Sequence, residues 1–267
     1  MNVGHSRERP PYDGPVTDAQ FQPVKSADRT LEILEVLADA PERIGLGHLA
    51  RTLSIPKSSL HGILRTMVRR GWVETDDSGQ LFGLGVRSLL VGASYVDRDD
   101  AVTRAQPLLD WLNAQVGETT HLGRLDGSDV VYLAKRESSH PLRMYSAIGR
   151  RLPAHATALG KALLAARDDG EVADLLPARL PTLTLNTIGD RDDLLAELDR
   201  IRAVGYAIDR EENSEGIRCF AVSLRTSRPP VDAVSVSAPT LRLDTRTEQR
   251  IIDVLVQANE RLLSPRT

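Results

Sequence analysis

The sequence feature that most constrains this chain is a pair of short amphipathic helices, predicted between Leu46 and Gly71. In both segments apolar residues recur at helical spacing, as expected for one buried helix face. These residues are Leu46, Leu49, Ala50 and Leu53 in the first segment and Leu60, Ile63, Leu64 and Met67 in the second. Pro56 lies between the segments, where it ends the first helix and fits the entry of the second. Two helices joined by so short a turn are typical of the helix-turn-helix, whose second helix enters the DNA major groove.

The polar face of the second helix is basic and contains no acidic residue from Lys57 to Arg70. We therefore predict that this face contacts DNA through Lys57, Ser58, Ser59, His61, Arg65, Arg69 and Arg70. The serines, the histidine and Arg65 are expected to face base edges, and a guanidinium matches the O6 and N7 acceptors of guanine. The remaining cations are expected to reach phosphates. The alternative is an ordinary helical hairpin with a solvated basic face.

The flanking sequence favours a winged form of this motif. A helix is predicted over residues 26–39, with Ser26 as its N-cap. Gly71 ends the helix pair, and two short strands are predicted next at residues 72–75 and 81–84. The turn between these strands contains two aspartates, which would repel phosphate, so we expect this wing to contribute little to DNA binding.

Composition limits the class of protein. With 267 residues the chain is long enough for two domains, and its net charge of -3 argues against a uniformly basic nucleic-acid coat. The single cysteine, Cys219, excludes an internal disulfide and fits a reducing compartment. No apolar run approaches the ~20 residues needed to span a membrane, and the N-terminus lacks the apolar core of a signal peptide. We therefore expect a cytoplasmic protein with no membrane partner.

Along the chain we predict four parts: a disordered tail (residues 1–23), a winged helix-turn-helix domain (24–85), linker helices that are a candidate self-association surface (86–117), and a second domain (118–267). In the second domain strands are predicted at 120–125, 130–135, 142–148, 206–208, 219–224 and 231–237, helices at 156–164, 190–204 and 247–263, and loops at 149–153 and 177–189. Hairpin strands with helices at the ends indicate an α+β domain around an antiparallel sheet.

Several motifs together resemble the IclR family of bacterial transcriptional regulators over nearly the whole chain. They are residues 55–64 (IPKSSLHGIL), 84–89 (LGVRSL), 153–162 (PAHATALGKA), 205–212 (GYAIDREE) and 216–219 (GIRC). The resemblance implies a winged helix-turn-helix, a linker helix and a GAF-like effector-binding domain. It also implies a homodimer or homotetramer that binds a palindromic double-stranded DNA operator and represses or activates a catabolic operon. Of these two effects we expect repression. Gly62 replaces the arginine often found at that point of the family's recognition helix, which changes the bases that could be read.

The resemblance also implies an effector site in the second domain. Its ligand-contacting positions match Ala158, Leu159, Asp209, Cys219, Ser235 and Ser237, and its apolar walls match Met144, Leu152 and Ile217. The residues themselves support a carboxylate effector such as glyoxylate or a pyruvate-like acid, because the small residues near Ala158 leave helix N-terminal amides reachable. Alternatively, these small residues only permit close packing. The alternating Val234-Ser235-Val236-Ser237 places both hydroxyls on one face of a strand, which is either solvent or a polar pocket.

Two other functions remain open from the sequence. An enzyme fused to a DNA-binding domain would use Cys219 as a nucleophile with His155 and Asp209, although no motif around the cysteine activates it. A constitutive DNA-binding protein would use the second domain only to form oligomers. The six histidines are scattered, so we predict no metal site, and no cofactor.

Overall fold

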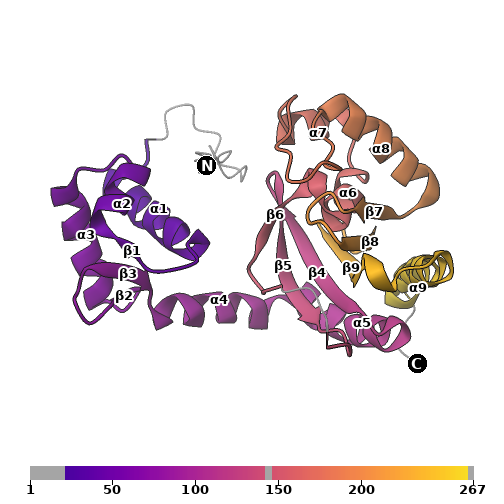
Figure 1. The fold of residues 1–267 in the computed structure, drawn as a ribbon, viewed down its shortest axis with the longest axis horizontal. Helices are drawn as coiled ribbons and strands as arrows, with labels where there is room; N and C mark the ends of the chain where they lie inside the picture. Colours follow the sequence, from indigo (N-terminus) through magenta and orange to yellow (C-terminus); the bar gives the residue numbers. More distant parts are fainter. Residues whose placement is uncertain (1–21, 142–145, 264–267) are drawn as a thin grey trace. The chain divides into compact units, whose positions relative to one another are not determined.

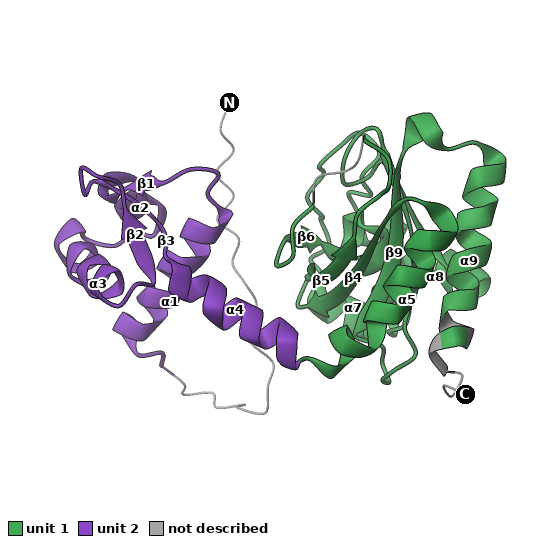
Figure 2. Cartoon of the chain, turned by 90° about the horizontal axis from the view of Figure 1, so that it is seen from below, with its two compact units in different colours: residues 1–12, 99–267 green, residues 13–98 purple. Residues whose placement is uncertain are grey.

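The computed structural model describes residues 22–141 and 146–263, and it confirms the predicted α+β fold (Figure 1). The chain divides into two compact units between Arg98 and Asp99 (Figure 2). The first unit comprises α1 (Lys25–Asp39), β1 (Ile44–Gly45), α2 (Leu46–Thr52), α3 (Lys57–Arg69), β2 (Val73–Thr75), β3 (Leu81–Leu84) and α4 (Val86–Arg98). The predicted tail at residues 1–23 lies almost entirely outside the described residues, and the predicted linker at 86–117 comprises α4 and α5, one in each unit.

The first unit is a three-helix bundle completed by a small antiparallel sheet with strand order β1-β3-β2. Its core contains half of the apolar residues that the helical spacing selected in α2 and α3, and the other half are partly buried against it. Strands β2 and β3 each add one buried residue. The buried set is Ile33, Leu37, Leu49, Ile55, Leu60, Leu64, Met67, Val73 and Phe82. Because these side chains bury one face of each helix, α3 keeps its opposite face exposed.

Two predictions in this unit need correction. Ser26 is not the N-cap of α1, because the helix begins one residue earlier and its cap position, Val24, makes no side-chain cap. The wing is a three-stranded sheet, since Ile44 and Gly45 pair with Phe82 and Leu81. A strand of two residues is too short to show a period-2 pattern, so no alternation predicts it.

The second unit comprises α5 (Asp100–Val116), β4 (Thr119–Asp126), β5 (Asp129–Arg136), β6 (Arg151–Pro153), η1 (Ala154–Ala156), α6 (Ala158–Leu164), α7 (Asp169–Leu175), α8 (Arg191–Val204), β7 (Ala207–Arg210), β8 (Ile217–Ser223), β9 (Asp232–Pro239), η2 (Thr240–Arg242) and α9 (Thr245–Leu263). The strands form an antiparallel sheet of order β6-β5-β4-β9-β8-β7. Helices α5 and α9 pack against one face of the sheet, and α6 packs against the other, with α8 beyond it (Figure 1). The side chains between α6 and the sheet are the setting of the candidate site.

Glycine ends two of these helices. Gly117 and Gly205 follow α5 and α8 with φ values of 72° and 83°, in the left-handed region that favours glycine. At the start of α5, the carboxylate of Asp99 accepts hydrogen bonds from the amides of Ala101 and Val102. This N-cap fixes the first residue of the second unit.

Other predictions in the second unit were partly wrong. The strand predicted at 142–148 lies mainly outside the described residues, and residues 146–148 are not a strand. The loop predicted at 149–153 ends in the short edge strand β6, a place where Pro153 is tolerated because an edge strand has a free side. The helix predicted at 156–164 is divided at Thr157, whose hydroxyl accepts a hydrogen bond from Gly160 N at 3.0 Å. α7 was not predicted, since its seven residues include only one buried residue, Val172, and so show no helical period.

No helix in the described part of the chain combines the length and the apolar character needed to cross a membrane.

Candidate functional site

The first candidate site is the outer face of α3. All seven residues that the sequence nominated there are exposed, whereas Leu60, Leu64 and Met67 on the opposite face are buried. Within the described residues, no ion pair involves the four cations of this face. The side chains of Lys57, Arg65, Arg69 and Arg70 therefore present positive charge to solvent, as a phosphate-binding surface requires.

Gly62 lies in the middle of this exposed face. A Cβ built at this position would meet nothing within 4 Å, and Gly62 is followed one turn later by Thr66, whose hydroxyl donates to the Gly62 carbonyl at 3.1 Å. Glycine in a helix interior is destabilising relative to alanine. The fold of the first unit therefore does not require a glycine here.

At the acidic wing tip, the side chain of Asp76 makes hydrogen bonds within the turn itself. The carboxylate of Asp76 accepts hydrogen bonds from Ser78 Oγ at 2.6 Å and from the amides of Gln80 and Leu81 at 2.9 Å. These hydrogen bonds lower the pKa of Asp76 to about 2, so the group remains ionised. A fixed negative charge at the turn disfavours contact between the wing tip and a phosphate.

The second candidate site is a small cavity of about 70 Å³ between α6 and the sheet. Its lining comprises Tyr132, Arg150, Leu152, Thr157, Ala158, Leu159, Asp209, Asn213, Ser214, Ile217, Cys219 and Ser235. Seven of these residues are among the nine that the family resemblance nominated. Ser237 does not line the cavity but lies opposite Cys219 in the β8–β9 register, and Met144 is outside the described residues.

Strand register explains why distant residues meet here. Asp209, Cys219 and Ser237 are register partners across β7, β8 and β9, so their side chains share one row on the α6 face of the sheet. Ser235 stands two residues earlier on β9 and therefore on the same face. Gly123 on β4 allows α6 to approach, because a Cβ there would lie 2.9 Å from Leu159 Cδ1.

Close packing of α6 also depends on glycine. A Cβ on Gly160 would lie 2.1 Å from the carbonyl oxygen of Ala154, so η1 and α6 could not approach each other as they do. The small residues of this segment therefore serve packing, while Ala158 and Leu159 also line the cavity. The two interpretations that the sequence left open are compatible.

The acid in the cavity has an unusual protonation equilibrium. Burial raises the pKa of Asp209 to about 7, against the opposing effect of the hydrogen bond that Glu212 N donates to Asp209 Oδ1 at 2.7 Å. Burial, together with the neighbouring carboxyl of Asp209, raises the pKa of the Cys219 thiol well above its usual value. A thiol in this environment stays protonated, which is the opposite of what nucleophilic catalysis requires.

The nominated catalytic partners are not assembled in the manner of a triad. His155 is buried, and its Nε2 lies 2.9 Å from the carbonyl oxygen of Pro181, while the lining of the cavity does not include it. Asp209 is the group that adjoins Cys219. Across the described residues there is also no cluster of three or more side chains suited to hold a metal ion.

Sequence reasoning missed five residues of the cavity: Tyr132, Arg150, Thr157, Asn213 and Ser214. Tyr132 is a buried aromatic residue that stacks on His121 with ring centroids 4.4 Å apart. Thr157 carried one available signal, because a threonine before a short helix is a typical N-cap. The others come from turns whose path a sequence pattern does not reveal.

Comparison with known proteins finds the same family for both parts of the chain. Residues 26–77 match the sequence model of the IclR helix-turn-helix domain, and residues 93–263 match that of the bacterial transcriptional regulator IclR C-terminal domain. The HTH-type transcriptional regulator KdgR of Dickeya chrysanthemi is 36% identical over 240 residues, covering 89% of this chain and 78% of the relative. The transcriptional repressor IclR of Escherichia coli is 31% identical over 234 residues, covering 86% and 84%. The crystal structure of a transcriptional regulator from Rhodococcus sp. RHA1 is similar with a TM-score of 0.70 and 30% identity, covering 89% of this chain and 100% of the other.

Proposed function

Since this chain belongs to the IclR family of bacterial transcriptional regulators, we propose that it is a repressor of a catabolic operon whose DNA binding responds to a small organic acid. The observation that carries the proposal is the presence, in one chain, of an exposed acid-free helix face and of a small polar cavity in a separate unit. The similarity to the Escherichia coli repressor supports the negative sign of regulation. As a DNA-binding regulator it would act in the cytoplasm.

For DNA, α3 supplies both kinds of contact that recognition needs. Its exposed cations neutralise phosphates and give the complex its dependence on salt. Arg65 lies near the middle of the helix, where a guanidinium can reach a guanine edge, and Ser58, Ser59 and His61 are exposed toward its N-terminus. The operator would be palindromic, with half-sites spaced by about one helical turn or a multiple, if two copies bind together.

For the effector, the cavity offers complementary groups to a compact carboxylate such as glyoxylate or a pyruvate-like acid. Ala158 and Leu159 occupy the first turn of α6, where backbone amides lack partners within the helix. Asp209 with its raised pKa can donate a hydrogen bond in its protonated form, and Ser235 can donate or accept. A volume of about 70 Å³ favours a small acid over a large aromatic one.

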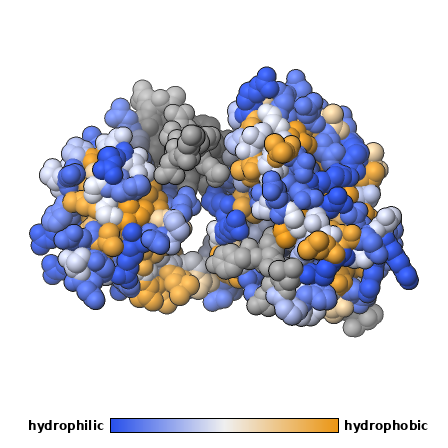
Figure 3. All heavy atoms as spheres, viewed as in Figure 1, coloured by the Kyte–Doolittle hydropathy of each residue, from blue (hydrophilic) through white to orange (hydrophobic). Residues whose placement is uncertain are grey.

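For assembly, α4 is the best candidate surface. Its exposed apolar side chains include Val86, Leu89, Leu90, Val91 and Tyr95, of which Leu89 is 69% exposed. Figure 3 shows hydrophobic residues gathered over this helix. A contiguous apolar face on a helix marks an interaction site, and in a homo-oligomer a second copy offers the matching face. We propose a homodimer through α4, or a homotetramer if the second units also associate.

In this mechanism the acid shifts a population of assembled states. A ligand can change an equilibrium only by binding one state more tightly than the other. The states would differ in the spacing of the two α3 helices, which must match the spacing of the operator half-sites. The acid therefore changes operator affinity without contacting DNA.

The direct test of the DNA-binding assignment is the variant Arg65→Ala, assayed by fluorescence anisotropy on the duplex upstream of the chain's own gene. Loss of a guanidinium–guanine contact is expected to cost ~1–3 kcal/mol and to relax the sequence preference at one position. The control is Arg246→Ala in α9, which removes one exposed arginine from the other unit. Equal affinity for wild type and Arg65→Ala would reject the assignment.

A further inference from the structure

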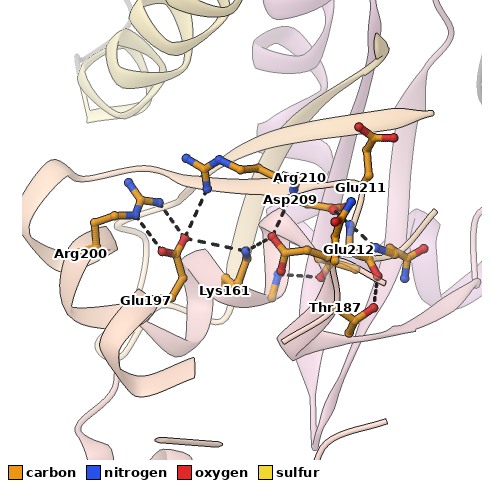
Figure 4. Close-up of polar contacts among 12 residues, drawn as sticks. Lys161, Thr187, Glu197, Arg200, Asp209, Arg210, Glu211 and Glu212 are labelled. Atoms are coloured by element: carbon orange, nitrogen blue, oxygen red, sulfur yellow. Dashed lines mark hydrogen bonds and ion pairs between the residues drawn. The ribbon is translucent and has the colours of Figure 1, made fainter. Parts of the chain in front are cut away.

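A buried ion pair adjoins the wall of the cavity, because Glu212 bonds to Asp209, but it takes no part in the lining. The side chain of Lys161 on α6 is fully buried, and its Nζ lies 2.5 Å from Glu212 Oε1 (Figure 4). Glu212 follows β7 and is itself 4% exposed. Glu197 of α8 lies 3.9 Å from the same Nζ and accepts hydrogen bonds from Arg200 at 2.7 and 2.8 Å.

Stability alone does not account for such a pair. Removing two charges from water is costly, and replacement of a buried ion pair by apolar side chains of similar volume is often neutral or stabilising. An ion pair differs from an apolar contact in being specific in direction and distance. We therefore expect this ion pair to fix the position of one part of the fold relative to another.

Glu212 makes hydrogen bonds to several segments besides its ion pair with Lys161. Its Oε1 accepts a hydrogen bond from Arg210 N at 3.1 Å, and its own backbone N–H donates to Asp209 Oδ1 at 2.7 Å. Its carbonyl accepts from the hydroxyl of Thr187 at 2.6 Å. Glu212 thus connects α6, the end of β7 and the loop before α8 at one residue.

The turn that Glu212 holds carries part of the cavity wall. Asp209, Asn213 and Ser214 all line the cavity and lie within five residues of one another. Glu211, beside Glu212, adopts a positive φ of 65° that side chains other than glycine rarely adopt. A turn with such a backbone keeps its shape only when its surroundings determine it.

We propose that Lys161 and Glu212 are positioning residues for effector recognition. Their ion pair fixes the turn at residues 209–214 against α6, so that Asp209 and Asn213 face a ligand that the pair itself does not touch. This inference rests on the proposed function, because it takes the cavity as the effector site. It adds two residues to those that determine effector affinity, and neither was nominated by the sequence.

The thiol of Cys219 provides a test that does not need the effector. It is the one cysteine of the chain, it is buried, and it lines the cavity beside Asp209. If the ion pair holds the turn closed, Lys161→Met leaves Glu212 without its partner and lets the wall open. The rate of thiol modification by dithiodipyridine is then expected to rise at least tenfold at a temperature well below unfolding.

The control breaks another ion pair of the same unit, one in which the carboxylate is buried and the arginine is partly exposed. Glu118 is 4% exposed and pairs with Arg242 at 2.6 Å, and neither residue lines the cavity. Glu118→Gln is expected to lower the melting temperature while leaving the Cys219 rate within twofold of wild type. An equal increase in both variants, or no increase in Lys161→Met, would overturn the inference.

A second variant covers the case in which Lys161→Met does not fold. Lys161→Met combined with Glu212→Gln removes both charges but keeps an acceptor for Arg210 N. We expect this double variant to recover the melting temperature while Cys219 remains fast to react, because the ionic tie to α6 is absent. Protection of the thiol equal to wild type would contradict the positioning role.

Ligand titrations of wild type and the same variants distinguish failure of the positioning role from failure of the proposed function. Calorimetric titration with pyruvate and glyoxylate is expected to show wild-type binding and at least tenfold weaker binding in both variants. If wild type binds neither acid, the proposed effector class is wrong, while the thiol rates still decide whether the ion pair holds the wall. If wild type binds an acid and the variants bind it equally well, the positioning role is wrong.

Discussion

Asp209 is an acid that burial holds near the midpoint of its titration at neutral pH, since its pKa is raised to about 7. Because Asp209 lines the cavity, its protonation state affects which ligands can bind there. An ionised carboxylate beside a bound carboxylate would repel it, whereas a protonated carboxyl can donate a hydrogen bond to it. Of the two forms, the protonated one is therefore expected to bind an acidic effector.

This protonation makes effector affinity depend on pH. The Kd for pyruvate should be constant below the pKa of Asp209 and rise about tenfold per pH unit above it, since binding then requires the uptake of a proton. Asp209→Asn, which keeps an N–H donor at all pH values, should remove that dependence. The measurement is calorimetric titration from pH 6 to 9 (roughly the range that brackets the pKa), and a pH-independent wild-type Kd would rule out a role for the protonated acid.

Gly62 is the other residue whose chemistry leads to a prediction. Because nothing lies within 4 Å of its missing Cβ, Gly62→Ala should stabilise the first unit by about 0.5–1 kcal/mol through the backbone entropy that glycine loses. Urea denaturation measures the change. Gly85→Ala serves as the control, because its Cβ would lie 2.4 Å from the carbonyl oxygen of Gly71 and should destabilise the unit. A destabilised Gly62→Ala would show that the exposed face is constrained by contacts within the chain.

The exposed apolar side chains of α4 lead to a prediction about the oligomeric state. Its apolar face is exposed, and Leu89 and Leu90 are 69% and 63% exposed. If this face joins two copies, Leu89→Glu with Leu90→Glu places charge in the interface and should lower the mass measured by sedimentation equilibrium. Leu185→Glu is the control, because Leu185 is fully exposed in the second unit. A wild-type monomer, or a double variant with unchanged mass, would contradict assembly through α4.

Elements with a long periodic pattern could be predicted from sequence, and short ones could not. The spacing of Leu194, Leu198 and Ile201 with a terminal glycine was sufficient for α8, and it needed no tertiary information. In contrast, β1 and β6 are strands only because a neighbouring strand offers hydrogen bonds, which are contacts made at long range. α7 begins with a capping box between Asp168 and Glu171, but its seven residues are too few to show a helical period.

The same distinction applies to the cavity. Alternation along β9 was enough to place Ser235 and Ser237 on one face, but it left open whether that face meets solvent or protein. The structure places it under α6, where Ser235 lines the cavity. Asn213 and Ser214 line the cavity because the turn that carries them is held by hydrogen bonds from Glu212 N and Asn213 N to Asp209. No local sequence pattern predicts these hydrogen bonds. Residues positioned by tertiary contacts thus need the structure to be found.

In the complete chain, the two candidate sites belong to separate compact units. The first unit presents the basic face of α3, and the second encloses the cavity. By linkage, an acid that changes operator affinity must itself bind with a different affinity when the operator is present. The central claim is therefore that binding of a duplex and of a small carboxylate are coupled in this chain.

Coupling between the two sites can be measured by fluorescence anisotropy of the upstream duplex, titrated at low and at moderate salt, without and with pyruvate or glyoxylate. We expect an affinity that falls steeply with salt, as release of counterions from phosphates requires, and that changes again when the acid is added. An affinity for every duplex that is absent or insensitive to salt would contradict the assignment of α3. A salt-sensitive affinity that neither acid alters would contradict the coupling to these effectors.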